Sequence, residues 1–518
     1  MPDSRTKNTA RSIVWGFANR FLNLLLPFII RTILIYFLGY NYVGLSSLFS
    51  SILQVLSFAE LGFGSAIVFC MYKPMAEGDN KKINAYLCHF RRIYRVVGIV
   101  ILLAGLATMP FLRYLIKGEV PSDINIYVLF LIFLCNSVIS YFVFAYKSSI
   151  FSAAQRGDIS SNIASITLII QSIIQIALLC IFKNYYFYIF VVPFFTLMNN
   201  IFVGIISKKR YPLLVPDGEI DSNEKRIIRD KVSGVLCQKI GGIVLASVDT
   251  IVISAYFGLT TLGIYNNYYY IINALFGFLA IVQTALIPSV GNSIQTESVD
   301  KNYDDFKKFH FFYIFIVTWW SVCLLCLYQP FMTIWVKESG LLPLIIPVLL
   351  TAYFYTYKFG DITYIYKSAI GLWDKWRFVP LIAAGLNLTV NLILSYFIGL
   401  PGIVISSIIS LVLVYFLLGS VPLFKFYFKD MRKWRTFLIT QIFYMGVAAF
   451  VCVGFYFACK FIPVSDGWLR LIVNALLCGL VAPIILLLIY WKYPTCVEAR
   501  KFTVGIISRF LRRGKNVK

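Results

Sequence analysis

Seven charged residues lie inside segments of this 518-residue chain that are otherwise apolar. Four of the seven are cations and three are carboxylates. A charge at the centre of a lipid bilayer costs about 2.5–3.5 kcal/mol on insertion scales, so such residues usually face a bundle interior or a watery cavity. A polar and slightly cationic interior suits a polar, anionic ligand. The seven residues are Arg20, Arg31, Glu60, Lys239, Asp249, Lys358 and Asp361.

Two of the cations fall on one stripe of the first apolar segment. Arg20 and Arg31 are eleven residues apart, which places them within about 20° of one helix face and about 16 Å apart along the axis. Asn23 and Pro27 lie close to the same stripe. Cations facing lipid would be costly, so we expect this stripe to line a cavity. The alternative is that each arginine neutralises a carboxylate, with Glu60 as the obvious partner.

Lys358 and Asp361 are three residues apart and can pair on the surface of one helix, which is the structural alternative to a functional role for either. Tyrosine and asparagine side chains accompany them. Such side chains offer flat apolar faces together with hydrogen-bond donors and acceptors. This mixture suits a sugar ring, and it equally suits packing between helices. The candidates are Tyr357, beside Lys358, and Asn266, Tyr270 and Asn273 on one face of the segment 263–294.

The carboxylates Glu60, Asp249 and Asp361 are candidates for binding a coupling Na⁺ or H⁺, because buried carboxylates often do so in transporters. We interpret both histidines, His89 and His310, as residues of cytoplasmic loops, with His310 at the very start of the segment 309–329. Proton coupling would therefore depend on a carboxylate.

The composition indicates a membrane protein. Hydrophobic residues make up 59% of the chain and charged residues 14%, with a mean hydropathy of +0.79. The net charge of +24 does not indicate a nucleic-acid partner, because the basic residues are confined to short loops and tails. No phosphate-binding glycine loop is present and no outer loop is long, so we predict neither an enzyme nor a cofactor.

None of the eleven cysteines falls in a predicted outer segment, so no disulfide framework is implied. Cys323 and Cys326 form a CxxC pair inside an apolar helix. Packing explains this pair more simply than a metal or redox site, and no metal site is predicted.

Fourteen segments are long and apolar enough to cross a bilayer as helices, which takes about 20 residues each. Several links between them are short and carry glycine, as tight turns between antiparallel helices do. We therefore predict an all-α polytopic membrane protein with about 14 transmembrane helices. The segments are 12–38, 43–72, 93–116, 124–147, 158–182, 186–206, 232–257, 263–294, 309–329, 341–366, 377–398, 401–424, 435–459 and 467–490.

Lys and Arg residues concentrate in alternate connecting segments. With the N-terminus in the cytoplasm, six of the 47 fall in or beside an outer segment. An excess of Lys and Arg on the cytoplasmic side is the usual orientation signal. We therefore predict a multi-pass protein whose two termini are both cytoplasmic. The six residues are Arg113, Lys117, Lys183, Lys337, Lys460 and Arg470.

The chain repeats itself at an offset of 219 or 220 residues. The offset spans six predicted helices, so both halves have the same orientation in the bilayer. Parallel repeats of this kind are a transporter architecture with the site at the repeat interface. The matching pairs are Arg20 with Lys239, Gly39 with Gly258, Gly44 with Gly263, and Tyr146-Lys147-Ser148 with Tyr366-Lys367-Ser368.

This repeat predicts a domain organisation of two parallel six-helix bundles followed by two additional helices. The predicted parts are an N-terminal bundle over 1–206, a cytoplasmic linker over 207–231, a C-terminal bundle over 232–424, helices 13 and 14 within 425–490, and a basic cytoplasmic tail over 491–518.

The opening residues carry a family resemblance. The stretch RSIVWGFANRFLNLLLPFIIRTILIYFLGYNYVGLSSLFSSILQVLSFAELGFGSAI resembles the start of Wzx-type polysaccharide flippases, and so does YKPMAEGDNKKINAYLCHFRRIYRVVG. These flippases belong to the multidrug/oligosaccharidyl-lipid/polysaccharide exporter (MOP) superfamily. The resemblance is strong in the first 100 residues and mostly architectural afterwards.

The resemblance implies export of an undecaprenyl-diphosphate-linked oligosaccharide across the bacterial cytoplasmic membrane, by two bundles that rock in alternating access. Cavity cations would hold the diphosphate or acidic sugars. The implied partners are the lipid-linked oligosaccharide, membrane lipids, Na⁺ or H⁺, and the polysaccharide polymerase machinery. The alternatives are an ion-coupled multidrug exporter of the same superfamily and a membrane enzyme of polysaccharide polymerisation. The cations with this implied role are Arg20, Arg31, Lys239 and Lys358.

Overall fold

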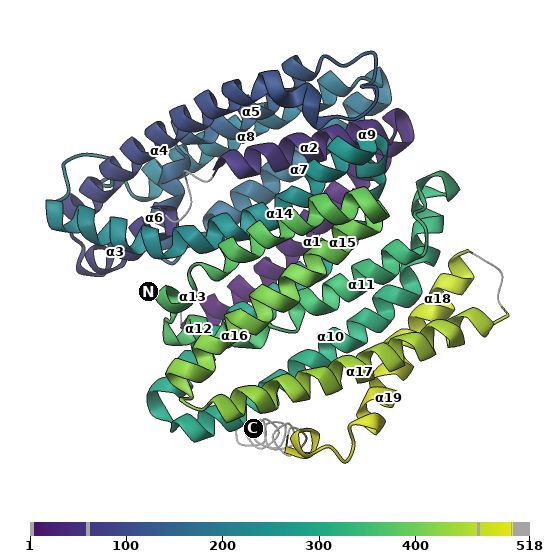
Figure 1. Cartoon of the computed structure of the whole chain (residues 1–518). Helices are drawn as coiled ribbons and strands as arrows, with labels where there is room; N and C mark the ends of the chain where they lie inside the picture. Colours follow the sequence, from purple (N-terminus) through teal and green to yellow (C-terminus); the bar gives the residue numbers. More distant parts are fainter. Residues whose placement is uncertain (1–4, 58–62, 464–466, 499, 501–518) are drawn as a thin grey trace, which may run out of the picture. The chain divides into compact units, whose positions relative to one another are not determined.

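The protein is all-helical in a computed structural model that describes residues 5–57, 63–463, 467–498 and 500. Within these residues there are helices and turns but no strands (Figure 1). The all-α class predicted from the sequence is therefore confirmed. The chain divides into two compact units, Met1–Asn266 and Asn267–Lys518. The duplication predicts a boundary in the linker 207–231 instead, and that division stays a prediction.

The first unit contains a bundle built from long antiparallel helices. Within it, α1 packs against α2 and α7, α4 against α5, and α8 against both α5 and α7. The helices are α1 Arg5–Leu38, α2 Tyr40–Leu56, α3 Phe63–Glu77, α4 Asn80–Thr108, α5 Ile126–Phe142, α6 Ser148–Ala153, α7 Gly157–Phe182, α8 Tyr185–Arg210 and the N-terminal part of α9 Ser222–Thr296.

The second unit begins inside α9 and contains the remaining helices. In this unit α10 packs against α11, α17, α18 and α19, while α14 and α15 form a close pair. The helices are α10 Val299–Val336, α11 Ile345–Lys358, α12 Asp361–Ile370, α13 Trp373–Trp376, α14 Val379–Ile398, α15 Leu400–Ser410, α16 Gly419–Pro422, α17 Met431–Phe461, α18 Trp468–Leu476 and α19 Ala482–Ile489. A π-helical segment, η7 Leu477–Val481, joins α18 to α19.

Helix starts follow local capping chemistry. The side chain of Asn125 accepts hydrogen bonds from the backbone N–H groups of Tyr127 and Val128 at 3.0 and 3.3 Å. Asp79 and Asp430 cap α4 and α17 in the same way. Such caps satisfy backbone donors that the first helical turn leaves without partners.

Ten helices of the described residues are long and apolar enough to cross a membrane, and eleven if the bent pair 126–142 and 145–153 is one span. The difference from fourteen has a structural reason. The helix α9 holds two predicted spans because it runs through a kink at Gly258. The predicted span 341–366 is divided between α11 and α12, and the described parts of 43–72 belong to α2 and α3. Each of the fourteen predicted spans thus has helical counterparts.

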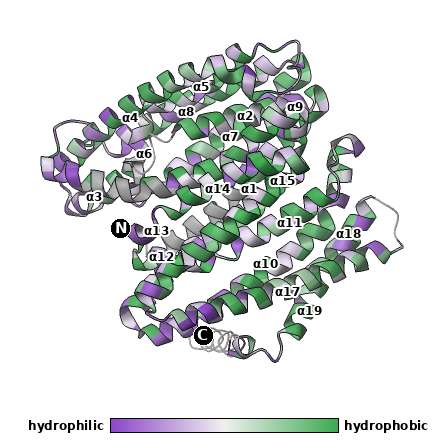
Figure 2. Cartoon of the chain, viewed as in Figure 1, coloured by the Kyte–Doolittle hydropathy of each residue, from purple (hydrophilic) through white to green (hydrophobic). Residues whose placement is uncertain are grey.

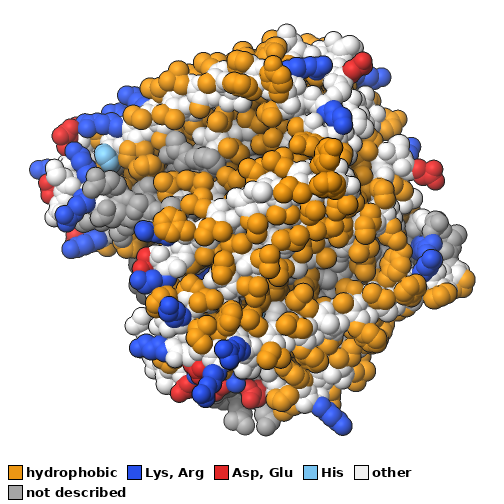
Figure 3. All heavy atoms as spheres, in the orientation of Figure 1, with side chains coloured by type: hydrophobic (Ala, Val, Ile, Leu, Met, Phe, Trp, Pro, Cys, Tyr) orange, Lys and Arg blue, Asp and Glu red, His pale blue; other side chains and the backbone are white. Residues whose placement is uncertain are grey.

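The outer surfaces of the helices are apolar. Phe397, Phe450 and Leu480 are 74%, 76% and 63% exposed. Figure 2 shows hydrophobic residues along the long helices and hydrophilic residues towards helix ends and loops. On the face drawn in Figure 3, hydrophobic side chains likewise cover the helices and charged side chains gather near their ends. Apolar surface of this extent suits lipid as the surrounding solvent.

The segment 207–231 contains residues that are ordered against α4. Leu214 and Ile220 are buried in a cluster with Ile83 and Phe90. Arg92 forms an ion pair with Glu219 at 3.0 Å. Glu224 likewise pairs with Lys82 at 2.8 Å, so two acidic residues of this segment pair with basic residues of α4.

Two glycines that the repeat aligns have the same unusual backbone conformation. Gly39 has φ 96° and ψ −175°, and Gly258 has φ 85° and ψ 174°. These angles lie in a region that is open to glycine and strained for other residues. The two tight turns therefore depend on glycine at these positions.

The turns that follow these glycines pack on each other reciprocally. A Cβ atom on Gly44 would lie 2.2 Å from the carbonyl oxygen of Leu259, and one on Gly263 would lie 2.2 Å from that of Tyr40. The side chain of Thr260 donates a hydrogen bond to Asn41, and the two residues are separated by the repeat offset of 219 residues. Equivalent residues of the two halves thus meet through their backbones, and only glycine permits this approach.

We predict that Gly44→Ala and Gly263→Ala each lower stability by about 1–3 kcal/mol, the usual range for overpacking a close contact. The reason is that the new methyl group collides with a backbone oxygen rather than with a movable side chain. The measurement is the thermal unfolding midpoint of the purified full chain in detergent.

Gly446→Ala in α17 is the matched control, because no atom outside the local helix backbone lies within 4 Å of its Cβ position. In a helix interior this change should be neutral or stabilising by up to about 1 kcal/mol. Equal midpoints for Gly44→Ala and Gly446→Ala would contradict the close-packing interpretation.

Candidate functional site

The candidate site in the second unit is built around an ion pair at the junction of two helices. The helix α11 ends at Lys358 and α12 begins at Asp361. The Lys358 Nζ lies 3.0 Å from the Asp361 carboxylate, and the two side chains are 5% and 9% exposed. Such a pair is almost fully removed from solvent, so each charge depends on the other for compensation.

Aromatic residues complete the surroundings of this pair. The Tyr313 hydroxyl donates a 2.5 Å hydrogen bond to Asp361. The Lys358 ammonium lies 4.9 Å from the ring centre of Phe276 and 5.0 Å from that of Tyr357. These two rings stack at 4.6 Å. The cation therefore has a carboxylate on one side and π faces on the other.

The geometry of Lys358 and Asp361 matches the structural alternative given in the sequence analysis, in which the two charges neutralise each other instead of binding a ligand. Lys358 is compensated and buried in this conformation. The same arrangement brings Tyr357, a predicted sugar contact, next to both charges. Three residues predicted to contribute to one site, Lys358, Tyr357 and Asp361, thus do lie together.

The side chains on the predicted polar face of α9, which are candidates for sugar contacts, differ in their exposure to solvent. Asn266 and Tyr270 are half-buried and Asn273 is exposed. The Nδ2 of Asn266 is buried, and no acceptor among the described residues receives its hydrogen bond. A buried amide of this kind has capacity for one more polar partner.

The cations of the first unit lie on α1 and α9. Arg31 is half-buried on α1 and lies within electrostatic reach of Tyr188 on α8. Arg20 also lies on α1, but its side chain is outside the described residues, as is the whole of Glu60. Lys239 is exposed on α9 and Asp249 is half-buried on the same helix.

The first unit also contains a polar hollow that was not predicted from the sequence. It is lined in part by Ser57, Tyr94, Asn136 and Thr196. The Thr196 hydroxyl donates to Asn136 at 2.7 Å. The signal was present, because Asn136 and Thr196 each interrupt an apolar span, but their convergence requires the packing of α5 on α8.

The predicted position of His310 in a cytoplasmic loop is wrong. Far from lying in a loop, it is 3% exposed inside α10, and its Nε2 makes a 2.8 Å hydrogen bond with Gln441 of α17. The helix α10 begins eleven residues earlier than that, at Val299, because Ser298 caps it by accepting from the Lys301 N–H. A buried histidine therefore lies within a helix that is long and apolar enough to cross a membrane.

Lys367, within the repeated Tyr-Lys-Ser motif, is also buried. Its Nζ donates to the Gly419 carbonyl at 2.5 Å and lies 3.9 Å from the ring centre of Trp376. These contacts give the motif a structural role at the junction of α12, α13 and α16.

Among the described residues, one group of potential metal ligands lies close enough to share an ion. It consists of Cys326, Cys459 and Cys478, and it is separate from the charged residues above. The prediction of no metal site did not anticipate this grouping.

Comparison with solved structures shows the fold of MOP-superfamily transporters. The lipid II flippase MurJ, in an inward closed conformation, is similar over 92% of this chain and 98% of its own, with a TM-score of 0.60 and 16% identity. An inward-facing MATE-family multidrug transporter is similar over 78% and 94%, with a TM-score of 0.59 and 16% identity. A mutant of the MATE transporter VcmN of Vibrio cholerae is similar over 83% of this chain and 98% of its own, with a TM-score of 0.55 and 12% identity.

No curated protein matches the sequence. The profile of the family described as "Polysaccharide biosynthesis protein" matches residues 9–293, which is more than half of the chain. The protein therefore belongs to the polysaccharide biosynthesis protein family.

Proposed function

We propose that the protein moves an undecaprenyl-diphosphate-linked oligosaccharide from the inner to the outer leaflet of the bacterial cytoplasmic membrane, for the synthesis of a cell-surface polysaccharide. The observation that carries this proposal is the family match, taken together with a fold similar to a lipid II flippase over 92% of the chain. The mechanism is alternating access, with both termini in the cytoplasm.

The headgroup of such a substrate is anionic, so it needs cations to replace the water that its phosphates lose. Arg20, Arg31 and Lys239 fill this role, since the first and last are aligned by the repeat and the second shares a helix stripe with the first. Moving one negative charge outward releases about 2.3 kcal/mol per 100 mV of membrane potential. The polyprenyl tail remains in lipid throughout.

The sugars need amides, hydroxyls and flat apolar faces. Asn266, Tyr270 and Asn273 supply these groups along one face of α9, and Tyr357 supplies an aromatic face. The Nδ2 of Asn266, which is buried without a described acceptor, supports this assignment. The hydroxyl-rich hollow around Asn136 is a further place where a sugar could bind.

Lys358 contributes to the site through its pairing with Asp361. In the conformation described, the pair and the Tyr313 hydroxyl compensate each other. Binding of a coupling Na⁺ or H⁺ at Asp361 would release the Lys358 ammonium for an anion. Glu60 and Asp249 are the other carboxylates that could take up the ion.

The alternating cycle requires a closure that forms and breaks. The reciprocal contact between 39–44 and 258–263, on the predicted outer side, is a suitable closure because it joins two turns through a few backbone atoms.

A second candidate is an ion-coupled multidrug exporter, since the MATE-family transporters have nearly the same structural similarity as the flippase. The charged residues inside the spans favour an anionic ligand over the cationic drugs that an acidic cavity would bind. A polymerising enzyme would need a large outer loop, which the predicted topology lacks.

We predict that Arg31→Glu abolishes export while the protein still inserts, because a carboxylate repels the diphosphate. Arg31→Lys is the control that keeps the charge. The measurement, in a strain that lacks the native gene, is lipid-linked oligosaccharide retained in the inner leaflet, together with surface polysaccharide and membrane-inserted protein. Normal export by the Arg31→Glu variant would contradict the proposal that Arg31 binds the anionic headgroup.

We predict that Lys358→Leu and Asp361→Leu each lower the stability of the purified chain by about 3–5 kcal/mol, since each leaves one uncompensated buried charge. The double variant should recover most of this loss, because it removes both charges. Unfolding midpoints in detergent check this pattern.

A transport measurement distinguishes a structural role of the Lys358–Asp361 pair from a role in ion coupling. We expect the stable double variant to remain defective in export, since it has no carboxylate to bind the ion. Export at the wild-type rate by the double variant would show that the pair only supports the fold.

A further inference from the structure

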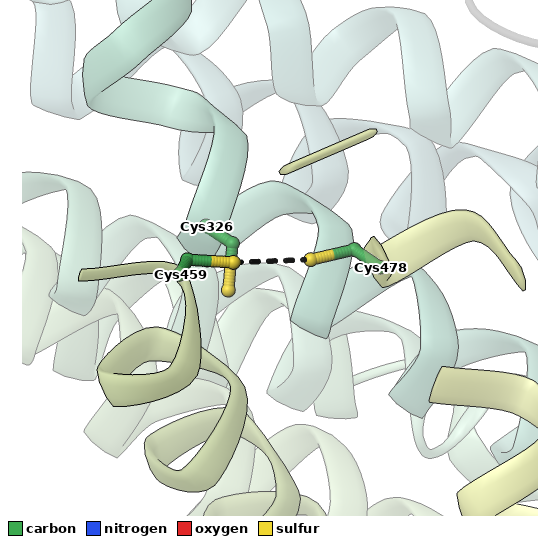
Figure 4. A group of neighbouring side chains, drawn as sticks. All are labelled: Cys326, Cys459 and Cys478. Carbon is green, nitrogen blue, oxygen red and sulfur yellow. Dashed lines mark hydrogen bonds between the residues drawn. The ribbon is translucent and has the colours of Figure 1, made fainter. Parts of the chain in front are cut away.

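Three cysteine side chains from separate elements of the second unit converge on one point. Cys326 comes from α10, Cys459 from the end of α17 and Cys478 from the π-helical segment η7. Figure 4 shows the three side chains directed towards one another. Their sulfur atoms all lie within 4.8 Å of one another, and those of Cys459 and Cys478 are 3.8 Å apart.

This spacing fits ligands of one metal ion. Thiolates bind zinc at about 2.3 Å in a tetrahedral arrangement, so two sulfurs on the same ion are about 3.8 Å apart. The Cys459–Cys478 separation already has this value. The third sulfur needs a shift of about 1 Å at most, which a change of side-chain torsion provides.

The cluster is buried and held in position. Cys326 and Cys459 are each 4% exposed and Cys478 is fully buried. The indole N–H of Trp319 donates a 3.0 Å hydrogen bond to the carbonyl of Cys478. This contact fixes the π-helical turn that carries the third sulfur, and π-helical turns often occur at functional sites.

We propose that Cys326, Cys459 and Cys478 bind one soft, thiolate-preferring metal ion of the zinc(II) or copper(I) class. Soft sulfur ligands select such ions. The ion would join α10, α17 and η7, and so hold the last two predicted spans against α10. The cluster lies outside residues 9–293, so this proposal does not depend on the family match or on the proposed function.

Charge balance favours zinc(II) within this class. Each thiol that becomes a ligand releases its proton to water. Three thiolates with zinc(II) have a net charge of −1, and three with copper(I) a net charge of −2. A smaller net charge costs less in a buried site.

Simple packing and a disulfide are the competing explanations. Cysteine packs well as a small apolar residue, which accounts for burial but not for the convergence of three sulfurs. A disulfide would use two of the three sulfurs and would need an oxidant. Both explanations predict that no ion binds.

The test uses the full chain purified in detergent under reducing conditions and loaded with zinc(II) alone or copper(I) alone. We expect one ion per chain by elemental analysis after dialysis, and a higher unfolding midpoint with the ion than without it. Cys326→Ser, Cys459→Ser and Cys478→Ser should each weaken binding at least about tenfold, since even the loss of a supporting group costs that much.

The variant Cys452→Ser is the matched control, because Cys452 is a half-buried cysteine on α17, the helix that also carries Cys459. It should keep the ion. Loading the unmodified chain with cadmium(II) gives a readout that needs no variant, since thiolate ligands produce a charge-transfer absorption.

Any of three results would overturn the proposal. The first is a chain that binds neither zinc(II) nor copper(I) and shows no cadmium absorption. The second is a Cys326→Ser/Cys459→Ser/Cys478→Ser variant that still binds one ion. The third is a peptide map of the protein prepared without reductant in which Cys459 and Cys478 are joined by a disulfide.

Discussion

A charge within a lipid-embedded bundle has to be neutralised or hydrated, and this constraint organises the polar interior of the protein. The ammonium of Lys358 forms an ion pair with Asp361 at 3.0 Å and cation–π contacts with Phe276 and Tyr357. Lys367 is met by a carbonyl and an indole ring instead of a carboxylate. Removal of one partner from such a group costs far more than the intact interaction contributes, because an uncompensated charge remains.

Glycine sets the second constraint, which concerns backbone approach. Gly39 and Gly258 turn the chain through the same angles, and Gly44 and Gly263 let each turn touch the backbone of the other. The offset of 219 residues that is visible in the sequence also relates Asn41 to its hydrogen-bond partner Thr260. The predicted repeat thus aligns residues that contact each other in the structure.

The sequence was sufficient for the helical class, because long apolar segments have one stable form in lipid. It also identified Lys358 and Asp361 as a possible pair, since a spacing of three residues places them on one face. It could not locate the helix break at Phe359 and Gly360 within 341–366, because this break follows from tertiary packing. His310 was misplaced because α10 begins at Val299, capped by Ser298, and continues through a stretch rich in charged residues. Convergence from distant segments, as with Asn136 and Thr196, leaves no periodic signal.

The helix α10 links the two clusters of the second unit. Tyr313, which donates to Asp361, and Cys326, in the thiol cluster, are thirteen residues apart on it, or about 20 Å along the axis. At 100° per residue they point to different sides of the helix, by about 140°. One side thus meets the α11–α12 junction, and the other meets α17 and η7. A helix of this length moves largely as a unit. An ion that holds α10 at the thiol cluster would therefore also restrict the position of the Tyr313 hydroxyl, along the helix axis, relative to Asp361. An ion bound at the cysteines would therefore restrict the conformations available to the buried ion pair without touching it.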